Sequence, residues 1–186
     1  MIGLFSLFIS AFALETGEKA PDFELTSTQG RSYSLSSFTG KVVVLEWFNP
    51  GCPFVVYAHK DGPLKNMAAE ASKDDVVWLA INSSAPGKQG HGLKVNQTAA
   101  SDWTMKHPIL LDESGEVGRK YGAVTTPQMF VIDATGTLVY GGALDNAPRG
   151  QVPESGLVDH VSNALSNIKA GEPVKTSKSR PYGCSV

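Results

Sequence analysis

The sequence predicts an α/β sandwich in which a mixed β-sheet lies between layers of helices. Residues 41–48 (KVVVLEWF) and 75–82 (DVVWLAIN) are rich in β-branched and aromatic residues and lack alternation, which is typical of central strands covered on both faces. A helical stretch separates these two strands, and an antiparallel strand pair and a final helix follow them. This order of elements predicts the α/β class and a sheet with both strand directions.

The first half of the chain is predicted to supply the sheet edge and its centre. Residues 23–34 could form an edge hairpin, and residues 41–48 should lie in mid-sheet. Residues 54–72 are predicted to be helical, with a kink or break at Gly62-Pro63 because proline disrupts a helix interior. The second central strand, residues 75–82, follows.

The second half is predicted to begin with a glycine-rich loop at residues 83–92 and a weaker helical stretch up to about Lys106. The later elements are a strand at 108–112, one or two helical turns at 116–122, two strands within 128–142 joined by a tight turn at 133–136, and a helix at 155–168. That last helix would place five apolar residues along one face: Leu157, Val158, Val161, Leu165 and Ile168.

The length of 186 residues suits one domain, which we predict at residues 20–170, followed by a polar tail at 171–186. Hydrophobic residues make up 41% of the chain and its formal net charge is −2. This charge gives no electrostatic reason to expect a nucleic-acid partner.

The N-terminal segment resembles the end of a secretory signal peptide. Residues 2–14 are mostly apolar and include the small-residue pattern Ala11-Phe12-Ala13, but the segment is too short to span a bilayer. We therefore expect residues 1–19 to be a signal peptide with a short linker, and the mature protein to be periplasmic or extracellular without a membrane span. Because no basic residue precedes Lys19, a buried N-terminal helix in a cytoplasmic protein is the alternative.

Cys52 and Cys184 are the two cysteines of the chain, and they form neither a CxxC motif nor a zinc-ligand pattern. No metal and no cofactor is therefore predicted. Cys52 lies where a central strand gives way to a helix, so its sulfur should lie exposed at the helix N-terminus. The amide groups and the dipole of a helix start favour the thiolate form, which is the nucleophile. The alternative is a buried, inert cysteine.

Two segments resemble the thioredoxin superfamily. The stretch EWFNPGCPFV, residues 46–55, is similar to its active-site segment, in which Cys52 matches the first cysteine of CxxC and Val55 stands in place of the second. The stretch YGAVTTPQMFVIDATGTLVY, residues 121–140, resembles the cis-proline strand. The branch most similar is the redoxin group, which includes the alkyl hydroperoxide reductase and thiol-specific antioxidant (AhpC/TSA) proteins and exported thiol-disulfide oxidoreductases. The resemblance implies a thioredoxin-like three-layer sandwich over roughly residues 20–168.

The resemblance also implies substrate contacts. Thr126-Pro127 would be the cis pair facing Cys52, with the Thr126 backbone free to pair with an extended substrate. The alternative is a plain loop before a strand. Near Cys52, Trp47, Asn49 and Pro53 are predicted as further substrate contacts, and Pro53 suits the first helical turn.

Glu46 lies inside an apolar strand, six residues before Cys52. A lone buried carboxylate is costly and usually has a raised pKa. The resemblance implies that Glu46 is a proton acceptor for thiol exchange, and the alternative is a carboxylate hydrogen-bonded for structural reasons. The other titratable candidates are histidines, which we predict to be surface or loop residues (His59, His91, His107) or structural (His160).

Cys184 lies in RPYGCSV near the end of the sequence. The residues after Gly171 could extend about 40 Å, enough to reach back across a domain of this size. Three arrangements remain open for its sulfur: a disulfide with Cys52 as the resolving cysteine, a free terminal thiol, or a disulfide with another chain.

Three functions follow. In the first, the protein is a thiol-disulfide oxidoreductase in which Cys52 attacks a protein or small-molecule disulfide and is released by Cys184 or by an external thiol reductant. In the second, it is a peroxiredoxin-like peroxidase that reduces hydroperoxides through a Cys52 sulfenic acid. Against the second, Asn49 replaces the expected Thr or Ser, Pro127 lies where an Arg is expected, and Arg119 is on another element. The third is a non-catalytic redoxin-fold binding module.

Overall fold

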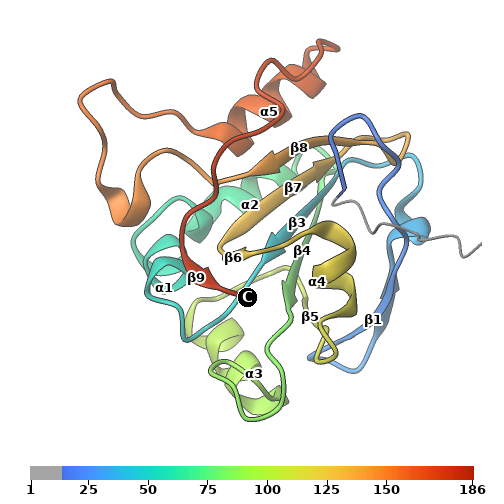
Figure 1. Ribbon diagram of the computed structural model, residues 1–186. Helices are drawn as coiled ribbons and strands as arrows, with labels where there is room; N and C mark the ends of the chain where they lie inside the picture. The colour runs from blue at the N-terminus through green and yellow to red at the C-terminus, as the bar shows by residue number, and fades with distance from the viewer. Residues whose placement is uncertain (1–13) are drawn as a thin grey trace, which may run out of the picture.

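The computed structural model describes residues 14–186 and shows a three-layer α/β sandwich (Figure 1). Its seven-stranded sheet has the order β2-β1-β5-β4-β3-β7-β8. The strands are β1 (Glu24–Ser27), β2 (Ser32–Ser34), β3 (Val43–Trp47), β4 (Val77–Asn82), β5 (Ile109–Leu111), β7 (Gln128–Ile132) and β8 (Leu138–Gly142). The apolar part of the predicted signal peptide lies almost entirely outside the described residues.

Both strand directions occur in the sheet, as predicted. Strand β4 runs parallel to β3 and β5, whereas β1 pairs antiparallel with β2 and β5, and β7 pairs antiparallel with β3 and β8. The predicted edge hairpin is confirmed as β1–β2. The β3 strand lies inside the sheet, between β4 and β7, and all its residues are buried.

The helices divide between the two faces of the sheet. They are α1 (Pro53–Lys60), α2 (Leu64–Ser72), α3 (Leu93–Asp102), α4 (Glu116–Tyr121) and α5 (His160–Lys169), with short 3-10 turns η1 (Leu35–Phe38) and η2 (Pro148–Gly150). Figure 1 shows α4 in front of the sheet and α2 behind it. The predicted break at Gly62-Pro63 separates α1 from α2.

Side chains alternate along β3 and so build two different cores. Val43, Leu45 and Trp47 point to one face and pack with Val117 and Tyr121 of the α4 layer. Val44 packs on the opposite face with Ala58 of α1, in the layer that also holds α2 and α5. Because successive strand residues point to opposite faces, Glu46 and Trp47 face different layers.

The last helix begins later than the sequence predicts. Helix α5 starts at His160, and the Asp159 side chain caps it by accepting a hydrogen bond from the Ser162 amide at 2.9 Å. Leu157 and Val158, predicted on its apolar face, precede the helix and are 59% and 38% exposed. The N-cap aspartate stops the helix where apolar periodicity alone would extend it.

The polar tail is docked on the domain. Its first part runs beside β8, where the Gly141 amide donates to the Ser177 carbonyl at 3.0 Å. It ends as β9 (Cys184–Ser185), which pairs antiparallel with β6 (Thr125–Thr126). Figure 1 shows this red segment descending past the sheet to the start of α1.

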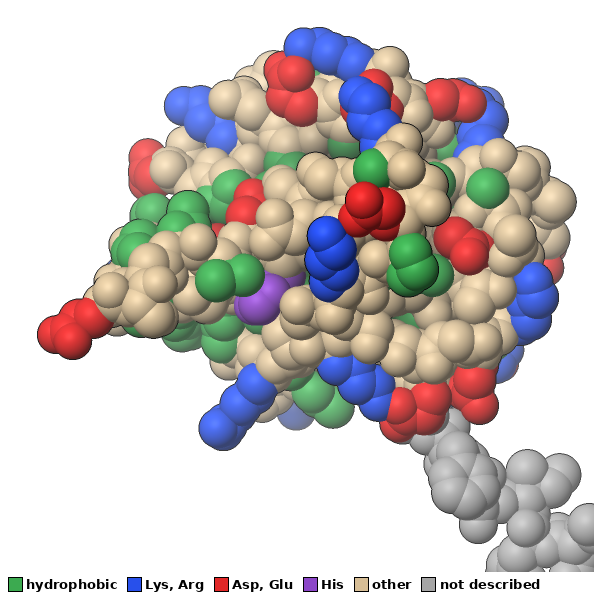
Figure 2. Space-filling view, turned by 90° about the horizontal axis from the view of Figure 1, so that it is seen from above, with side chains coloured by type: hydrophobic (Ala, Val, Ile, Leu, Met, Phe, Trp, Pro, Cys, Tyr) green, Lys and Arg blue, Asp and Glu red, His purple; other side chains and the backbone are tan. Residues whose placement is uncertain are grey.

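Charged side chains of both signs are interspersed over the face seen from above in Figure 2, which agrees with a net charge of −2. Over residues 14–186, no helix has the length and apolar character needed to cross a membrane. Within the same residues, no three His, Cys, Asp or Glu side chains gather into a site that could hold a metal ion.

Candidate redox site

Cys52 lies at the start of α1, as predicted. It is the N-cap residue, with extended backbone angles, and Pro53 occupies the first helical turn. The Cys52 amide donates to the Asn49 carbonyl at 3.0 Å, which closes the turn between β3 and α1. The predicted exposure of this sulfur is wrong, because Cys52 is 0% exposed. The C-terminal tail covers it, and sequence patterns give no sign of how a tail folds back.

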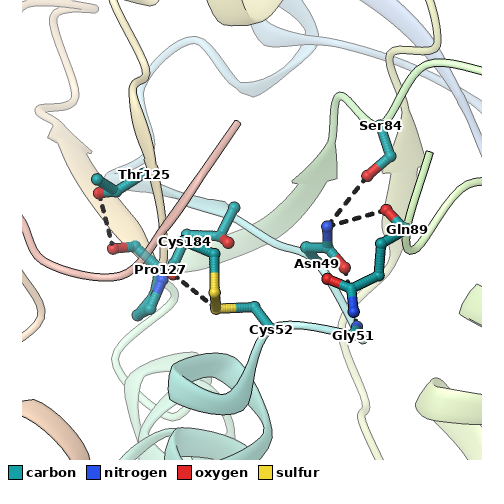
Figure 3. Close-up of a disulfide and its surroundings, with 9 residues drawn as sticks. Asn49, Gly51, Cys52, Ser84, Gln89, Thr125, Pro127 and Cys184 are labelled. Atoms are coloured by element: carbon teal, nitrogen blue, oxygen red, sulfur yellow. Dashed lines mark hydrogen bonds between the residues drawn. A yellow bond between two sulfur atoms is a disulfide. The ribbon is translucent and has the colours of Figure 1, made fainter.

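The structure pairs Cys52 with Cys184 in an intramolecular disulfide, with the two Cα atoms 6.0 Å apart and a sequence separation of 132. Of the three arrangements left open for Cys184, this is the one found. Figure 3 shows Cys184 approaching Cys52 from the side opposite α1. The tail thus supplies the second sulfur that a CxxC motif would place on the helix.

The position of the missing cysteine is filled by an apolar side chain. Val55 is 0% exposed and shares a core cluster with Cys52, Phe48 and Ile109. Valine has no thiol, so this position cannot take part in disulfide exchange. Cys52 is therefore the one cysteine at this helix start, and the apolar side chains of its cluster hold it in place by packing.

The Thr126–Pro127 peptide bond is cis, as predicted. The Thr126 carbonyl oxygen lies 3.1 Å from Sγ of Cys52, so the cis-proline segment faces the sulfur. The Thr126 backbone is not free, however, because it pairs with Cys184 across the β6–β9 ladder. In the oxidised protein, the chain's own tail occupies the edge that was predicted to bind an extended substrate.

Asn49 organises the loop beside the disulfide. Its Oδ1 accepts from the Gly51 amide at 2.8 Å, and its Nδ2 donates to the Gln89 carbonyl at 3.0 Å and to Ser84 Oγ at 3.3 Å (Figure 3). Asn49 is 8% exposed, and Gly90 passes so close that a Cβ there would lie 2.2 Å from its Oδ1. These contacts hold the glycine-rich loop against the start of α1.

The predicted substrate contact of Trp47 is wrong. Its side chain is 0% exposed and packs against Tyr121 and Phe130, with ring centroids 5.4 Å and 5.1 Å away. Its indole Nε1 donates to Ser83 Oγ at 3.1 Å. Strand alternation turns Trp47 toward the α4 layer, away from Cys52.

Glu46 is not a lone carboxylate. It is fully buried, and its oxygens lie 2.6 Å from His59 Nε2 and 3.1 Å from Trp78 Nε1, which donates to it. Burial alone would raise the pKa of Glu46, but the adjacent His59, with smaller contributions from His107 and Trp78, lowers it below its usual value. The raised pKa expected from the sequence is therefore wrong, because a partner on α1 stabilises the charge.

The predicted surface positions of His59 and His107 are wrong. His59 is 2% exposed, because its position on α1 turns it inward toward Glu46. The His107 side chain is 9% exposed and lies 3.9 Å from Glu46, and burial lowers its pKa to about 4.

The other two histidines lie where they were predicted. His91 lies in the glycine-rich loop, 3.0 Å from Glu113. His160, predicted to be structural, is the first residue of α5 and stacks on Tyr140 with ring centroids 6.1 Å apart.

The tail has anchors that the sequence analysis missed. The Tyr182 hydroxyl donates to Asp145 Oδ1 at 2.6 Å, and burial together with this carboxylate raises the pKa of Tyr182. Upstream, Ser179 Oγ lies 2.6 Å from the Tyr140 hydroxyl and accepts from the Ala143 amide at 2.9 Å. The aromatic residue in RPYGC was a possible signal, but nothing in the sequence identifies Asp145 as its partner.

Gly183 permits the tail to approach the cis-proline segment. Its φ of +139° is unfavourable for other residues, and a Cβ at this position would lie 1.9 Å from the Thr126 carbonyl oxygen. Glycine directly before Cys184 is therefore required by two independent features of the docked tail, its backbone angle and its contact with β6.

Comparisons with known proteins agree with this geometry. A sequence model of the redoxin family matches residues 15–158. The chain is 29% identical over 133 residues to the thiol-disulfide oxidoreductase ResA of Geobacillus thermodenitrificans, covering 70% of this chain and 71% of that protein. It is 28% identical over 146 residues to the chloroplastic peroxiredoxin Q of Gentiana triflora, covering 72% and 62%.

A solved structure extends the likeness to nearly the whole chain. The crystal structure of an uncharacterized conserved protein from Geobacillus kaustophilus superposes with a TM-score of 0.83 at 27% identity, covering 93% of this chain and 92% of that one. The crystal structure of a putative thiol:disulfide interchange protein DsbE from Chlorobium tepidum also superposes, with a TM-score of 0.58 at 26% identity, covering 69% of this chain and 85% of that one. The fold is thioredoxin-like, as the resemblance implied. With its family match spanning most of the described domain, this chain belongs to the redoxin family.

Proposed function

We propose that the protein is a thiol-disulfide oxidoreductase in which Cys52 is the nucleophile and Cys184 is the resolving cysteine. The observation that carries the proposal is the disulfide between these residues, formed at the start of α1 and beside the cis-proline. Membership of the redoxin family supports an oxidoreductase activity in general. The relative ResA is named a thiol-disulfide oxidoreductase, which supports the finer assignment.

The cycle consists of two thiol-disulfide exchanges. The Cys52 thiolate attacks one sulfur of a substrate disulfide, a Cys52–substrate bond forms, and the other substrate sulfur leaves as a thiolate. The Cys184 thiolate then attacks Cys52 Sγ, which forms the internal disulfide and releases the second substrate sulfur. The substrate gains two electrons and the protein loses two, so an external thiol must restore the reduced protein.

The β6 edge is the proposed docking position for an extended substrate. In the oxidised protein β9 pairs there, with Cys184 opposite Thr126. When the internal disulfide is reduced, the two-residue ladder, the hydrogen bonds of Ser179 and Tyr182, and the ring contact between Tyr182 and Phe54 still hold the tail. A substrate segment can then replace β9 on the same backbone groups, which would bring its own sulfur to the position of Cys184. Pro53 and Asn49 lie at this end of α1 and remain proposed contacts.

For Glu46 we propose a positioning role in addition to the proton-acceptor role implied by the resemblance. Glu46 comes from β3 and His59 from α1, so their 2.6 Å contact joins the strand to the helix that carries Cys52. The ring of Phe48, a member of the cluster around Cys52, lies 5.5 Å from that of His59. The pair is thus connected to the sulfur by packing.

A peroxidase is the second candidate, favoured by the likeness to peroxiredoxin Q. In it, a hydroperoxide transfers oxygen to the Cys52 thiolate, and Cys184 displaces water from the sulfenic acid to give the same disulfide. The surroundings support it less. Both side-chain polar atoms of Asn49, Oδ1 and Nδ2, already bond to loop backbone groups. The Arg119 guanidinium on α4 donates to the Ser114 carbonyl at 3.0 Å. Both side chains are thus engaged in contacts of their own. A non-catalytic binding module is the third candidate.

One experiment separates these candidates. The reduced wild type and the Cys52→Ser and Cys184→Ser variants are mixed in turn with a peptide disulfide and with hydrogen peroxide, and the products are followed by mass spectrometry. We expect the wild type to form the internal disulfide faster with the peptide disulfide, Cys184→Ser to stop at a Cys52 mixed disulfide, and Cys52→Ser to be inert. Faster oxidation by peroxide would favour the peroxidase. Reaction with both oxidants no faster than a small free thiol would leave only the binding module.

We also propose that the protein is exported. The apolar segment at residues 2–14 and its small-residue pattern support this, and disulfides persist mainly in oxidising compartments. Fractionation of cells producing the full chain, with N-terminal sequencing of the product, tests it. An uncleaved chain in the cytoplasmic fraction would contradict it.

A further inference from the structure

The two cysteines of the disulfide differ in exposure. Cys52 is 0% exposed, whereas Cys184 is partly exposed and lines a pocket of 420 Å³. We name this the Cys184 pocket. Its lining residues are Phe48, Asn49, Ser83, Ser84, Ala85, Lys88, Gln89, Thr126, Cys184, Ser185 and Val186. Cys52 does not belong to this lining, so a molecule in the pocket meets Cys184 and not Cys52.

The pocket contains a polar group that lacks a protein partner. Oγ1 of Thr126 is buried and makes no hydrogen bond within the described residues, although Thr126 is only 3% exposed. A buried hydroxyl without a partner costs free energy, so the docked β9 leaves this residue of the lining with an unsatisfied polar group. Thr126 pairs directly with Cys184 in the β6–β9 ladder, so this hydroxyl lies close to Cys184, the more exposed of the two cysteines.

The charge of the lining indicates the kind of ligand. Lys88, in the glycine-rich loop, is basic, and no Asp or Glu belongs to the lining. Asn49, Ser84 and Gln89 lie on one side of the disulfide, across from the cis-proline segment (Figure 3). The lining side chains thus combine one positive charge with neutral hydrogen-bonding groups, and the backbone of Val186 adds its α-carboxylate. This combination suits a small molecule that carries both a carboxylate and an ammonium group.

We propose that the Cys184 pocket binds an acidic low-molecular-weight thiol, which reduces the protein by attacking Cys184 rather than Cys52. The proposal rests on the proposed function, because it describes the half of the cycle that restores the reduced protein. The two cysteines thereby have opposite roles: Cys52 attacks the substrate, and Cys184 is attacked by the reductant.

The exchange balances as follows. The thiolate of the reductant forms a bond to Cys184 Sγ, the Cys52–Cys184 bond breaks, and its electron pair remains on Cys52. That sulfur lies at the N-cap of α1, whose dipole and free amide groups stabilise the departing thiolate. A second thiol then attacks the sulfur of the bound reductant, which frees Cys184 and leaves the reductant as its own disulfide.

Mapping of the first intermediate tests the direction of attack. The oxidised wild type is mixed with glutathione at pH 7, excess N-ethylmaleimide is added at short, increasing times, and the modified peptides are identified by mass spectrometry. At the earliest times we expect glutathione on Cys184 and N-ethylmaleimide on Cys52. Glutathione on Cys52, on both cysteines equally, or on neither would overturn the proposal. In guanidinium chloride, where both sulfurs are accessible, the preference should disappear.

Lys88→Glu tests the pocket itself. We expect the rate of reduction by glutathione to fall about tenfold, and the rate with uncharged 2-mercaptoethanol to change little, because only the acidic thiol interacts with the lysine charge. Lys94→Glu, an equal charge change on α3 outside the pocket lining, is the control. Equal effects on both thiols, or an equal effect in the control, would overturn the pocket assignment. The reaction of reduced Cys52 with a peptide disulfide is measured separately, so a failure of the proposed function is distinguishable.

Discussion

Cys52 and Cys184 form one disulfide but are held in contrasting ways. Cys52 belongs to a core cluster with Phe48, Val55 and Ile109, at a junction fixed by a fully buried strand. Cys184 belongs to a two-residue strand at the end of a polar tail. We infer from this contrast that the core fixes the position of Cys52, the proposed nucleophile, and we propose that the segment carrying Cys184 can detach without unfolding the domain.

Two quantities separate these regions experimentally. The free energy of unfolding of the reduced protein reports on the core around Cys52. The equilibrium constant of the internal disulfide against glutathione reports on how well the docked tail presents Cys184. If the contrast is correct, a change in one region alters mainly its own quantity.

The largest expected effect is on the core. Glu46→Gln removes the negative charge that faces His59 inside the protein, and weakening a buried hydrogen bond to a charged group costs about 3 kcal/mol. We expect urea unfolding of the reduced variant to show a loss of this size. The control, Glu116→Gln, removes an exposed partner of Lys120 and should leave the unfolding midpoint unchanged. Equal behaviour of the two variants would show that the Glu46–His59 pair does not stabilise the core.

The next effect is on the tail. In Gly183→Ala the new Cβ would lie 1.9 Å from the Thr126 carbonyl oxygen, at a φ of +139°. Since neither strain can be relieved while β9 stays paired, we expect the equilibrium constant of the internal disulfide to fall about a hundredfold. The unfolding free energy of the reduced protein should not change.

Gly171→Ala is a matched control for this substitution. Gly171 also has a positive φ, of +70°, but a Cβ there would meet nothing within 4 Å. The control should therefore change the disulfide equilibrium much less than Gly183→Ala. Equal changes would contradict the docking of β9 against β6.

A smaller effect is expected from pH, and it again belongs to the core. Burial lowers the pKa of His107 from 6.5 to about 4, although Glu46 acts in the opposite direction. Below pH 6.5 the unfolded chain binds a proton that the folded protein does not accept, so stability present at neutral pH is lost as the pH falls toward 4. This histidine should cost about 2 kcal/mol of unfolding free energy between pH 7 and pH 5.

Urea unfolding at both pH values measures this loss. The His107→Gln variant should lose less unfolding free energy between pH 7 and pH 5 than the wild type does, by most of the amount assigned to His107. An unchanged pH dependence in the variant would mean that His107 is readily protonated in the folded protein. The same titration in Gly183→Ala should match that of the wild type, because the tail takes no part in this effect.

The smallest effect concerns the tail anchor. Tyr182→Phe removes the hydroxyl that donates to Asp145, a hydrogen bond of 2.6 Å to a charged group. We expect the equilibrium constant of the internal disulfide to fall about tenfold, in line with the net contribution of such a bond. Tyr33→Phe, on the hairpin at the opposite edge of the sheet, should leave the constant unchanged. A null result for Tyr182→Phe would show that β9 alone positions Cys184.

The sequence predicted the fold well because its signals are local. The apolar runs of β3 and β4, the Gly62-Pro63 break and the tight turn between β7 and β8 each appear in a few adjacent residues. The cis bond at Pro127 was also predicted, but through the resemblance, since proline alone gives a cis bond too rarely.

The candidate site was predicted only in part because several of its contacts join distant residues. His59 was assigned to the surface, although its contact with Glu46 depends on how α1 packs against β3. The burial of Cys52 and the Tyr182–Asp145 bond depend on the path of the tail, which polar residues without periodicity do not reveal. The predicted contact of Trp47 is wrong because strand alternation turns its buried side chain away from Cys52.

The most direct test of the account compares the two sulfurs in isolation. The reduced Cys184→Ser and Cys52→Ser variants, each with one thiol, are mixed with the same peptide disulfide at pH 6, and the rates are measured by stopped flow. The account predicts that the Cys52 thiol reacts at least about tenfold faster, because the start of α1 stabilises its thiolate. Equal rates, or a faster Cys184 thiol, would contradict the assignment of Cys52 as the nucleophile.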